Sequence, residues 1–146
     1  MPGLLTCSVW RPDDFDAAFA LYRDALRELL DAAVGWDETA QRDRFRQTLM
    51  SGQTEWLMHG AHRVGLISVA AADADVHVHI LLIAAAWQQR GMGSAALRAL
   101  ERRYPSASGI RLSCLTNNRR ALRFYQRHGY CAQGADAHFM TLRKPL

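Results

Sequence analysis

The sequence of 146 residues is poor in the features that mark several classes of protein. Its three cysteines, Cys7, Cys114 and Cys131, are odd in number and widely spaced. They fit neither a disulfide framework nor a zinc cluster, and they indicate a reducing compartment. No apolar run approaches the roughly 18 residues that a membrane helix needs, so we expect no membrane-spanning segment. Residues 1–10 lack a basic start followed by an apolar stretch, so we expect no secretory signal and a cytoplasmic location.

Lysine is also nearly absent, and the positive charge comes almost entirely from arginine. The net charge of +4 is unevenly divided, because residues 1–86 carry 7 basic and 12 acidic side chains whereas residues 87–146 carry 11 and 2. A basic half indicates an anionic partner such as a nucleotide, a phosphate ester or nucleic acid, and a solvated helix face is the alternative. There is no helix-turn-helix signature and no aromatic-rich strand, so we expect no nucleic-acid partner.

The length and the composition, with 49% hydrophobic and 22% charged residues, predict one folded domain over residues 1–146. Helical and strand patterns alternate along it without a linker or a repeat, which predicts an α/β layered domain with a mixed sheet. The expected strands cover residues 4–10, 55–59, 63–72, 76–83, 110–115, 130–132 and 139–142, and the expected helices cover 13–34, 37–51, 94–104 and 118–128. The first helix carries one apolar stripe, which predicts a buried face. The second helix is polar, with Phe45, Leu49 and Met50 as its only anchors.

A loop with Gly91 and Gly93 joins the strand at 76–83 to the third helix. Backbone N–H groups at the start of a helix are unpaired, and glycine lets them approach a phosphate closely. The segment from Gln89 to Ser94 is therefore a candidate cradle for a pyrophosphate, and an ordinary structural turn is the alternative. The loop is neither a Walker loop nor a full dinucleotide fingerprint.

Two motifs carry a resemblance to a known family. Gln88-x-x-Gly91-x-Gly93 resembles the acyl-CoA signature of the GCN5-related N-acetyltransferases, the GNAT family. The segment from Asn118 to Tyr130 is similar to the family's Asn…Ala…Phe-Tyr…Gly-Phe/Tyr helix. The order of the expected elements from Leu4 to Leu142 also matches. The resemblance implies a GNAT-type layered fold, with a mixed, mostly antiparallel sheet of about six to seven strands flanked by about four helices.

The resemblance further implies an acetyl-CoA-dependent N-acetyltransferase, in which a primary amine attacks the thioester directly in a ternary complex. A non-catalytic acyl-CoA-binding or regulatory domain of the same fold is the alternative. The acceptor is a small molecule or a protein amine that the sequence does not identify, no metal is expected, and a homodimer is one open arrangement. The cofactor-binding residues that the resemblance implies are Leu81, Leu82, Ile83, Gln88, Gln89, Arg90, Gly91, Met92, Gly93, Ser94, Asn118 and Tyr125.

Three side chains are candidates for moving protons. Tyr125 matches the family position beside the thioester sulfur, where a hydroxyl protonates the leaving thiolate, and packing in the core is the alternative. His77 and His79 alternate on one strand, so both are expected on one face, where an imidazole accepts the proton of the amine. His77 ranks first because some relatives place a glutamate there, and a solvated strand face is the alternative. The two histidines and the Phe-Tyr-Gln-Arg segment are locally similar to arylalkylamine N-acetyltransferases.

Other chemistry-bearing residues have weaker cases. Trp36, Asp37 and Glu38 stand where the family walls its acceptor site, so they are candidates for attracting and stacking on an ammonium group. A helix N-terminus that favours acidic residues explains the same pattern. Cys114 lacks a partner base and is expected to be a buried thiol. The remaining histidines, His128 among them, are expected on the surface.

Overall fold

The computed structural model describes residues 5–146, and it contains a seven-stranded sheet with four α-helices. The strands are β1 (Leu5–Val9), β2 (Gln53–His59), β3 (His62–Ala72), β4 (Asp75–Ile83), β5 (Gly109–Leu115), β6 (Cys131–Ala135) and β7 (Phe139–Pro145). The helices are α1 (Phe15–Val34), α2 (Glu38–Ser51), α3 (Met92–Arg103) and α4 (Arg119–Arg127). Every expected element is present with bounds shifted by a few residues, and Leu4 lies outside the described residues.

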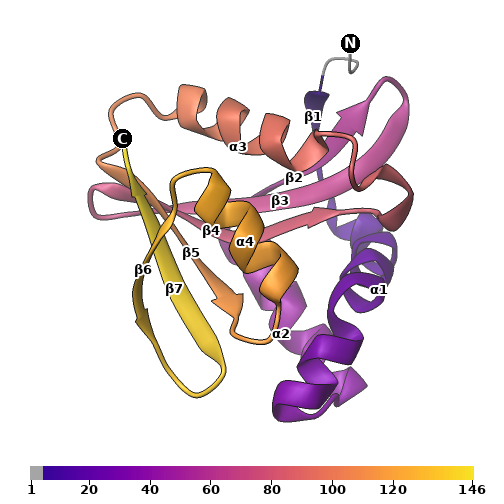
Figure 1. The fold of residues 1–146 in the computed structure, drawn as a ribbon. Helices are drawn as coiled ribbons and strands as arrows, with labels where there is room; N and C mark the ends of the chain where they lie inside the picture. The colour runs from indigo at the N-terminus through magenta and orange to yellow at the C-terminus, as the bar shows by residue number, and fades with distance from the viewer. Residues whose placement is uncertain (1–4) are drawn as a thin grey trace.

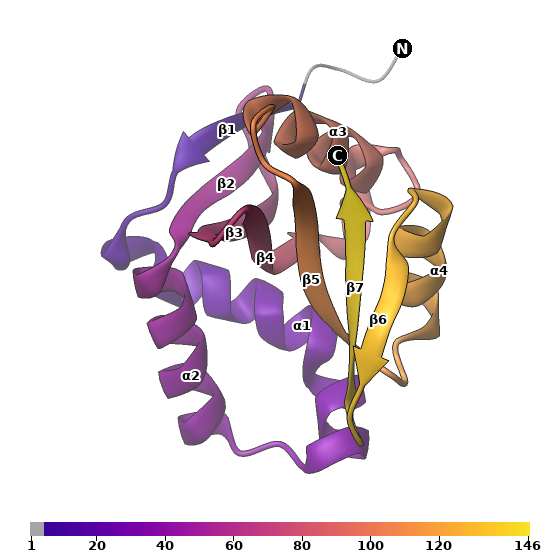
Figure 2. The ribbon, with the colours of Figure 1, turned by 90° about the vertical axis from the view of Figure 1, so that its left-hand side faces the viewer.

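The sheet is mixed and mostly antiparallel, as the resemblance implies. Its strand order is β1-β2-β3-β4-β5-β7-β6, and the pairing of β4 with β5 is parallel whereas the five other pairings are antiparallel. Helices α1 and α2 cover one face of the sheet, and α3 and α4 cover the other (Figures 1 and 2). The two layers of helices bury two separate clusters of apolar side chains. One cluster packs α3 and α4 on the sheet, and the other packs α1 and α2 on it.

Strands β4 and β5 pair at one end only, and this opens the middle of the sheet. Their register runs from Asp75 opposite Gly109 to Val78 opposite Leu112 and goes no further. Beyond that point, β4 continues beside β3 while β5 continues beside β7. The two central strands therefore diverge, and the sheet splays between them (Figure 2).

A buried ionic cluster holds the paired end of β4 and β5 together. The carboxylate of Asp75 accepts hydrogen bonds from Nε and Nη2 of Arg143 at 2.9 Å and from Nη2 of Arg111 at 3.2 Å. These hydrogen bonds lower the pKa of Asp75 to about 2. The guanidinium groups come from β7 and β5, so a single carboxylate on β4 ties three strands at the end opposite the splay.

The boundaries of the first two helices follow the expected chemistry. Gly35 ends α1 with a positive φ of 81°, a conformation that glycine adopts without a steric penalty. Asp37 caps α2, because its side chain accepts a hydrogen bond from the backbone N–H of Ala40. One expected anchor of α2 is wrong, since Met50 is exposed. The third inward position is filled by Gln41, which is buried and whose Oε1 accepts a hydrogen bond from the hydroxyl of Tyr22 at 3.0 Å.

The apolar stripe of α1 divides between the core and an open surface. Phe15, Ala18, Phe19 and Leu30 are buried, in agreement with the expected buried face. Side chains on the same stripe, such as Leu26 and Leu29, are only half-buried and line a cleft beside the splay. Some positions of α1 that look core-facing in the sequence therefore face this cleft instead.

Candidate active site

A cleft of about 1770 Å³ lies where the sheet splays, and we call it the central cleft. One wall is formed by His79 to Ile83 of β4, and another by Leu112 to Leu115 of β5 with the exposed side of α4. The loop before α3 closes one part of the cleft, and the facing sides of α1 and α2 close the rest. The cleft thus brings together segments from most of the chain.

The β4 wall has a backbone edge that no strand within residues 5–146 covers. Leu81, Leu82 and Ile83 pair with β3 on one side, whereas the pairing with β5 has already ended at Val78. All three residues line the central cleft. A strand edge with open N–H and C=O groups pairs with an extended amide chain.

The loop between β4 and α3 is fixed to the end of β4. The Nε2 atom of Gln88 donates a hydrogen bond of 2.9 Å to the carbonyl oxygen of Ile83. Gln89 has a positive φ of 64°, which turns the chain sharply into the helix. Gln88 and Gln89 line the cleft, as does Met92, which is also part of the core. Arg90 does not line the cleft, and its guanidinium lies over the ring of Trp87 at 5.0 Å.

The two glycines of this loop serve different purposes. Gly91 is the N-cap of α3 with a φ of +78°, and a Cβ added there would meet no atom within 4 Å. Gly91 therefore leaves open space at the start of the helix, as a phosphate cradle requires. A Cβ on Gly93 would lie 3.0 Å from Cζ of Phe124 on α4. The absence of a side chain at Gly93 consequently permits the close packing of α3 against α4.

Two asparagines organise the turn before α4. Oδ1 of Asn118 accepts a hydrogen bond from the backbone N–H of Ala121, so Asn118 caps the helix and keeps its amide N–H groups for another partner. Nδ2 of Asn117 donates a hydrogen bond of 3.0 Å to the carbonyl oxygen of Leu29 on α1. Both asparagines line the cleft. The bond from Asn117, which the sequence analysis missed, ties the two helical layers together across the cleft.

Tyr125 is almost fully buried and lines the central cleft. Its ring lies 5.3 Å from that of Phe124 and 5.9 Å from that of Tyr130, both in edge-on arrangements. Burial raises the pKa of the Tyr125 hydroxyl above its ordinary value, so this group keeps its proton at neutral pH. The environment acts on sulfur in the same way, since burial raises the pKa of the neighbouring Cys114 thiol to about 11. Cys114 is buried as expected, and it too lines the cleft.

The comparisons with known proteins agree with this geometry. The family model of the acetyltransferase (GNAT) domain matches residues 25–143, a span that contains the loop with Gly91 and the helix with Tyr125. The chain belongs to the GNAT acetyltransferase family. Acetyl-CoA is the cosubstrate that this family uses. No curated protein matches the sequence significantly.

Solved structures with the same fold are distant in sequence. An acetyltransferase from Thermus thermophilus is 22% identical, with a TM-score of 0.75 and coverage of 100% of both chains. The PaiA N-acetyltransferase from Thermoplasma acidophilum, solved in complex with coenzyme A, is 12% identical, with a TM-score of 0.77 and coverage of 98% of this chain and 99% of that one. Ard1 from Thermoplasma volcanium is 16% identical, with a TM-score of 0.71 and coverage of 97% of each chain.

The structure separates the paired histidines of this GNAT domain. Ser68 of β3 is opposite Ile80 and Val69 is opposite Val78, so His79 is an extra residue that forms a β-bulge in β4. His79 lines the central cleft, whereas His77 lines a separate pocket of about 440 Å³ beside Asp75. The two rings nevertheless lie 6.0 Å apart. Partial burial and the neighbouring His77 lower the pKa of His79, which favours the neutral imidazole.

The segment between α1 and α2 is divided in its roles. Trp36 and Asp37 line the central cleft, and Asp37 is at the same time the cap of α2. Glu38 lies outside the cleft lining, where its carboxylate binds Arg23 and accepts a hydrogen bond from the indole N–H of Trp36. Glu38 thus holds this segment through its contacts with Arg23 and Trp36. The cap expectation for Asp37 is confirmed, and the attraction of an ammonium group by Asp37 or Glu38 stays a prediction.

The exposed side of α4 supplies positive charge to the cleft. Arg119, Arg120, Arg123 and Arg127 all line it, and all four are exposed. They account for a large part of the basic half noted in the sequence. Within residues 5–146, no group of three or more histidine, cysteine or acidic side chains is arranged to hold a metal ion. None of the helices in that range has the length and apolar character needed to cross a membrane.

Proposed function

We propose that this protein transfers the acetyl group of acetyl-CoA to a primary amine, by direct attack within a ternary complex. The observation that carries the proposal is the central cleft, which joins an open strand edge, an unobstructed helix N-terminus and a buried tyrosine. The pantetheine arm, an extended chain with two amides, pairs with Leu81 to Ile83. The pyrophosphate lies on the N–H groups at Gly91, in the same cleft that the arginines of α4 line. The amide of Asn118 donates to the arm.

The transfer needs one proton removed and one proton supplied. His79 accepts the proton of the amine, directly or through a water molecule, because it is the histidine in the cleft and its neutral form is favoured. The nitrogen of the neutral amine bonds to the thioester carbon and passes its surplus proton to His79 as it does so. The C–S bond then breaks, the thiolate takes the hydroxyl proton of Tyr125, and the tyrosinate regains a proton from solvent. Burial raises the pKa of the Cys114 thiol, and a thiolate released into the same surroundings has its basicity raised in the same direction, which supports a proton donor at this point.

The acceptor enters from the side of α1 and α2 in this proposal. That wall presents Leu26, Leu29, Trp36 and Phe45 together with the polar groups of Tyr22. Such a wall favours a primary amine attached to an apolar or aromatic body, either a free small molecule or a protein residue. A panel of amines assayed by release of free CoA tests this, and we expect aromatic amines to be acetylated faster than polyamines of similar length. Absence of CoA release with every amine would favour the alternative of a non-catalytic acyl-CoA-binding domain.

Cofactor binding is tested by thermal unfolding. Acetyl-CoA at about 100 times its dissociation constant is expected to stabilise the fold by about 2.7 kcal/mol. Gly91→Leu is expected to abolish that stabilisation, because a side chain at this position fills the open space at the start of α3. Gly60→Leu is the matched control, since Gly60 also has a positive φ of 61° and open surroundings but lies in the turn between β2 and β3.

Both glycine variants should lose a similar amount of intrinsic stability, because each forces a side chain into the left-handed region. Only Gly91→Leu should lose the response to acetyl-CoA. A normal response in Gly91→Leu, or none in the unaltered protein, contradicts the proposed cradle.

The assignment of the base is tested by the pH dependence of kcat/KM. Activity should rise with pH through a group whose pKa lies below the ordinary histidine value of about 6.5, because the imidazole must be neutral to accept a proton. His79→Ala is expected to lower the rate at pH 7 by about tenfold and to lose less at pH 9, where free amine and hydroxide partly replace the base.

The same measurement decides which of the two histidines contributes more to proton removal. His77→Ala should have the smaller effect, because His77 lines a different pocket. The exposed His138, in the turn before β7, provides a control that should keep the profile of the unaltered protein. A larger loss in His77→Ala than in His79→Ala would restore the ranking expected from the sequence.

A further inference from the structure

A hydrogen bond links the cofactor loop to the far end of α4. Oγ of Ser94 and Nε2 of His128 lie 2.8 Å apart. Ser94 is in the first turn of α3 and lines the central cleft, whereas His128 is the C-cap of α4 and packs against the ring of Phe124 at 4.8 Å. The residues are 34 positions apart in the sequence, and no pattern there connects them. His128, expected on the surface, is in fact half-buried behind the cradle.

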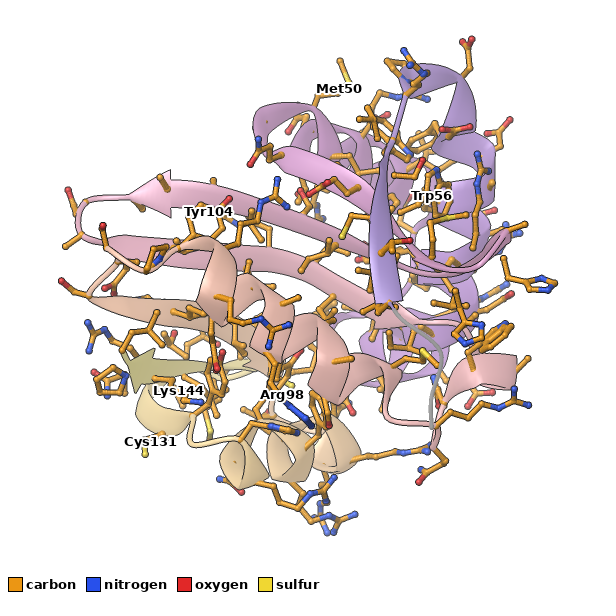
Figure 3. The ribbon with its side chains drawn as sticks, turned by 90° about the horizontal axis from the view of Figure 1, so that it is seen from above. Met50, Trp56, Arg98, Tyr104, Cys131 and Lys144 are labelled. Carbon is orange, nitrogen blue, oxygen red and sulfur yellow. The ribbon has the colours of Figure 1, made fainter. Side chains whose placement is uncertain are left out.

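Charged groups surround His128 from three elements. Within residues 5–146, the cations that act on it are Arg98 on α3, Arg127 on α4 and Lys144 on β7, and the anion is Glu101 on α3. Arg98 and Lys144 are labelled in Figure 3. Glu101 is largely neutralised, because its carboxylate binds the ammonium of Lys144 at 2.7 Å. Burial and the three cations lower the pKa of His128, so the imidazole of the free protein is mostly neutral at pH 7.

Whether Nε2 of His128 carries a proton determines what Ser94 presents to the cleft. A charged imidazole carries a proton on Nε2 and donates it to Oγ of Ser94, which leaves the serine proton free to point at an anion. A neutral imidazole with a bare Nε2 instead receives the serine proton, and Oγ then presents only lone pairs to the cleft. A phosphate group accepts a hydrogen bond from Ser94 in the first arrangement, whereas the lone pairs of Oγ repel it in the second.

We propose that His128 is a positioning residue that acts through Ser94 and couples the uptake of one proton to the binding of the cofactor pyrophosphate. This inference rests on the proposed function, because it requires the phosphates to lie at the start of α3. The pyrophosphate brings negative charge toward a histidine that otherwise faces mostly cations. Binding therefore raises the pKa of His128, and by linkage the cofactor binds more tightly as the pH falls through the range between the free and bound pKa values.

Isothermal titration calorimetry with 3′-dephospho-CoA tests this between pH 6 and pH 8. This probe keeps the pyrophosphate but lacks the phosphate monoester of CoA, whose own second pKa of about 6 would complicate the measurement. Titrations in buffers of different ionisation enthalpy give the number of protons taken up. We expect net proton uptake near neutral pH, and a dissociation constant about threefold to tenfold lower at pH 6 than at pH 8, since one pKa unit corresponds to a factor of ten.

Two substitutions at His128 separate its roles. His128→Gln keeps a neutral N–H donor at about the same reach, so it should bind the probe well at both pH values and without the His128-linked proton uptake. His128→Leu removes the donor, so it should bind about threefold to tenfold more weakly at pH 6 and lose the same proton uptake. Ser94→Ala should also lose this uptake, because the connection to the phosphate is broken. His138→Gln, at an exposed position, should retain the full uptake.

The outcomes distinguish this inference from the proposed function. Binding of the probe with no proton uptake, or with the same uptake in His128→Leu, overturns the role of His128 and leaves the cofactor site intact. Full uptake in Ser94→Ala overturns the route through the serine. If the unaltered protein binds neither dephospho-CoA nor acetyl-CoA, both proposals are overturned.

Discussion

Tyr125→Phe is expected to reduce kcat by tenfold to a thousandfold while acetyl-CoA binds with unchanged affinity. The substitution removes one hydroxyl from a buried ring whose packing against Phe124 and Tyr130 is retained. In the proposed mechanism the hydroxyl acts only when the C–S bond breaks, so its loss should raise the barrier without weakening the bound state. Steady-state kinetics, together with calorimetric titration of acetyl-CoA, separate these two effects.

Tyr130→Phe is the matched control for this experiment. Tyr130 is also fully buried and its ring touches that of Tyr125, but it does not line the central cleft. Its substitution should leave kcat within about twofold, since buried packing is preserved and no reacting group is lost. Equal kcat values for Tyr125→Phe and the unaltered protein would mean that Tyr125 is a packing residue and that the thiolate is protonated by solvent.

In the proposed mechanism, a hydroxyl with a raised pKa acts as the acid, and burial also affects the group that accepts its proton. A proton moves readily when donor and acceptor have similar pKa values. Burial raises the pKa of the Tyr125 hydroxyl, and it raises the pKa of the Cys114 thiol at the same place in the cleft. In the proposed mechanism the thiolate of CoA forms in that environment. Desolvation therefore raises the pKa values of the proposed donor and acceptor in the same direction.

The sequence predicted the fold well, for a physical reason. The helix stops, the turn glycines and the caps are local signals, and Gly35, Asp37 and Asn118 act in the structure as their residue types suggest. The loop with Gly91 and the helix with Tyr125 are contiguous motifs of fixed spacing. Such features depend on neighbours within a few residues, so one sequence contains the information.

Other features of the site depend on contacts between distant segments. The bulge that separates His79 from His77 arises from the register between β3 and β4, and strand periodicity alone cannot place it. The reason for Gly93 is the ring of Phe124, about 30 residues later, rather than a phosphate. The bond from Ser94 to His128 is also formed between helices. Residues that meet only through the packing of distant segments cannot be paired from the hydrophobic periodicity of the sequence.

Gly65 provides a direct test of how the cleft edge is built, and its substitution is expected to have the largest effect on stability. A Cβ at this position of β3 would overlap the carbonyl oxygen of Leu82 and would lie 3.2 Å from Cδ1 of Leu57. The first contact is with backbone, which cannot rotate away, so β4 itself must shift. Gly65→Ala should therefore reduce the free energy of unfolding by about 3 kcal/mol, at the upper end of the usual cost of overpacking.

The shift should also reach the cofactor, because Leu82 belongs to the strand edge proposed to pair with pantetheine. We expect Gly65→Ala to unfold in urea at a clearly lower midpoint. We also expect the folded molecules of this variant to bind acetyl-CoA more weakly than the unaltered protein does. Gly134→Ala on the exposed strand β6 is the control, since a Cβ there meets nothing within 4 Å and should change stability by less than about 0.5 kcal/mol. Equal midpoints for the two variants would show that β4 moves to accommodate the added methyl group at little cost. The position of the open β4 edge would then not be fixed by its packing against β3.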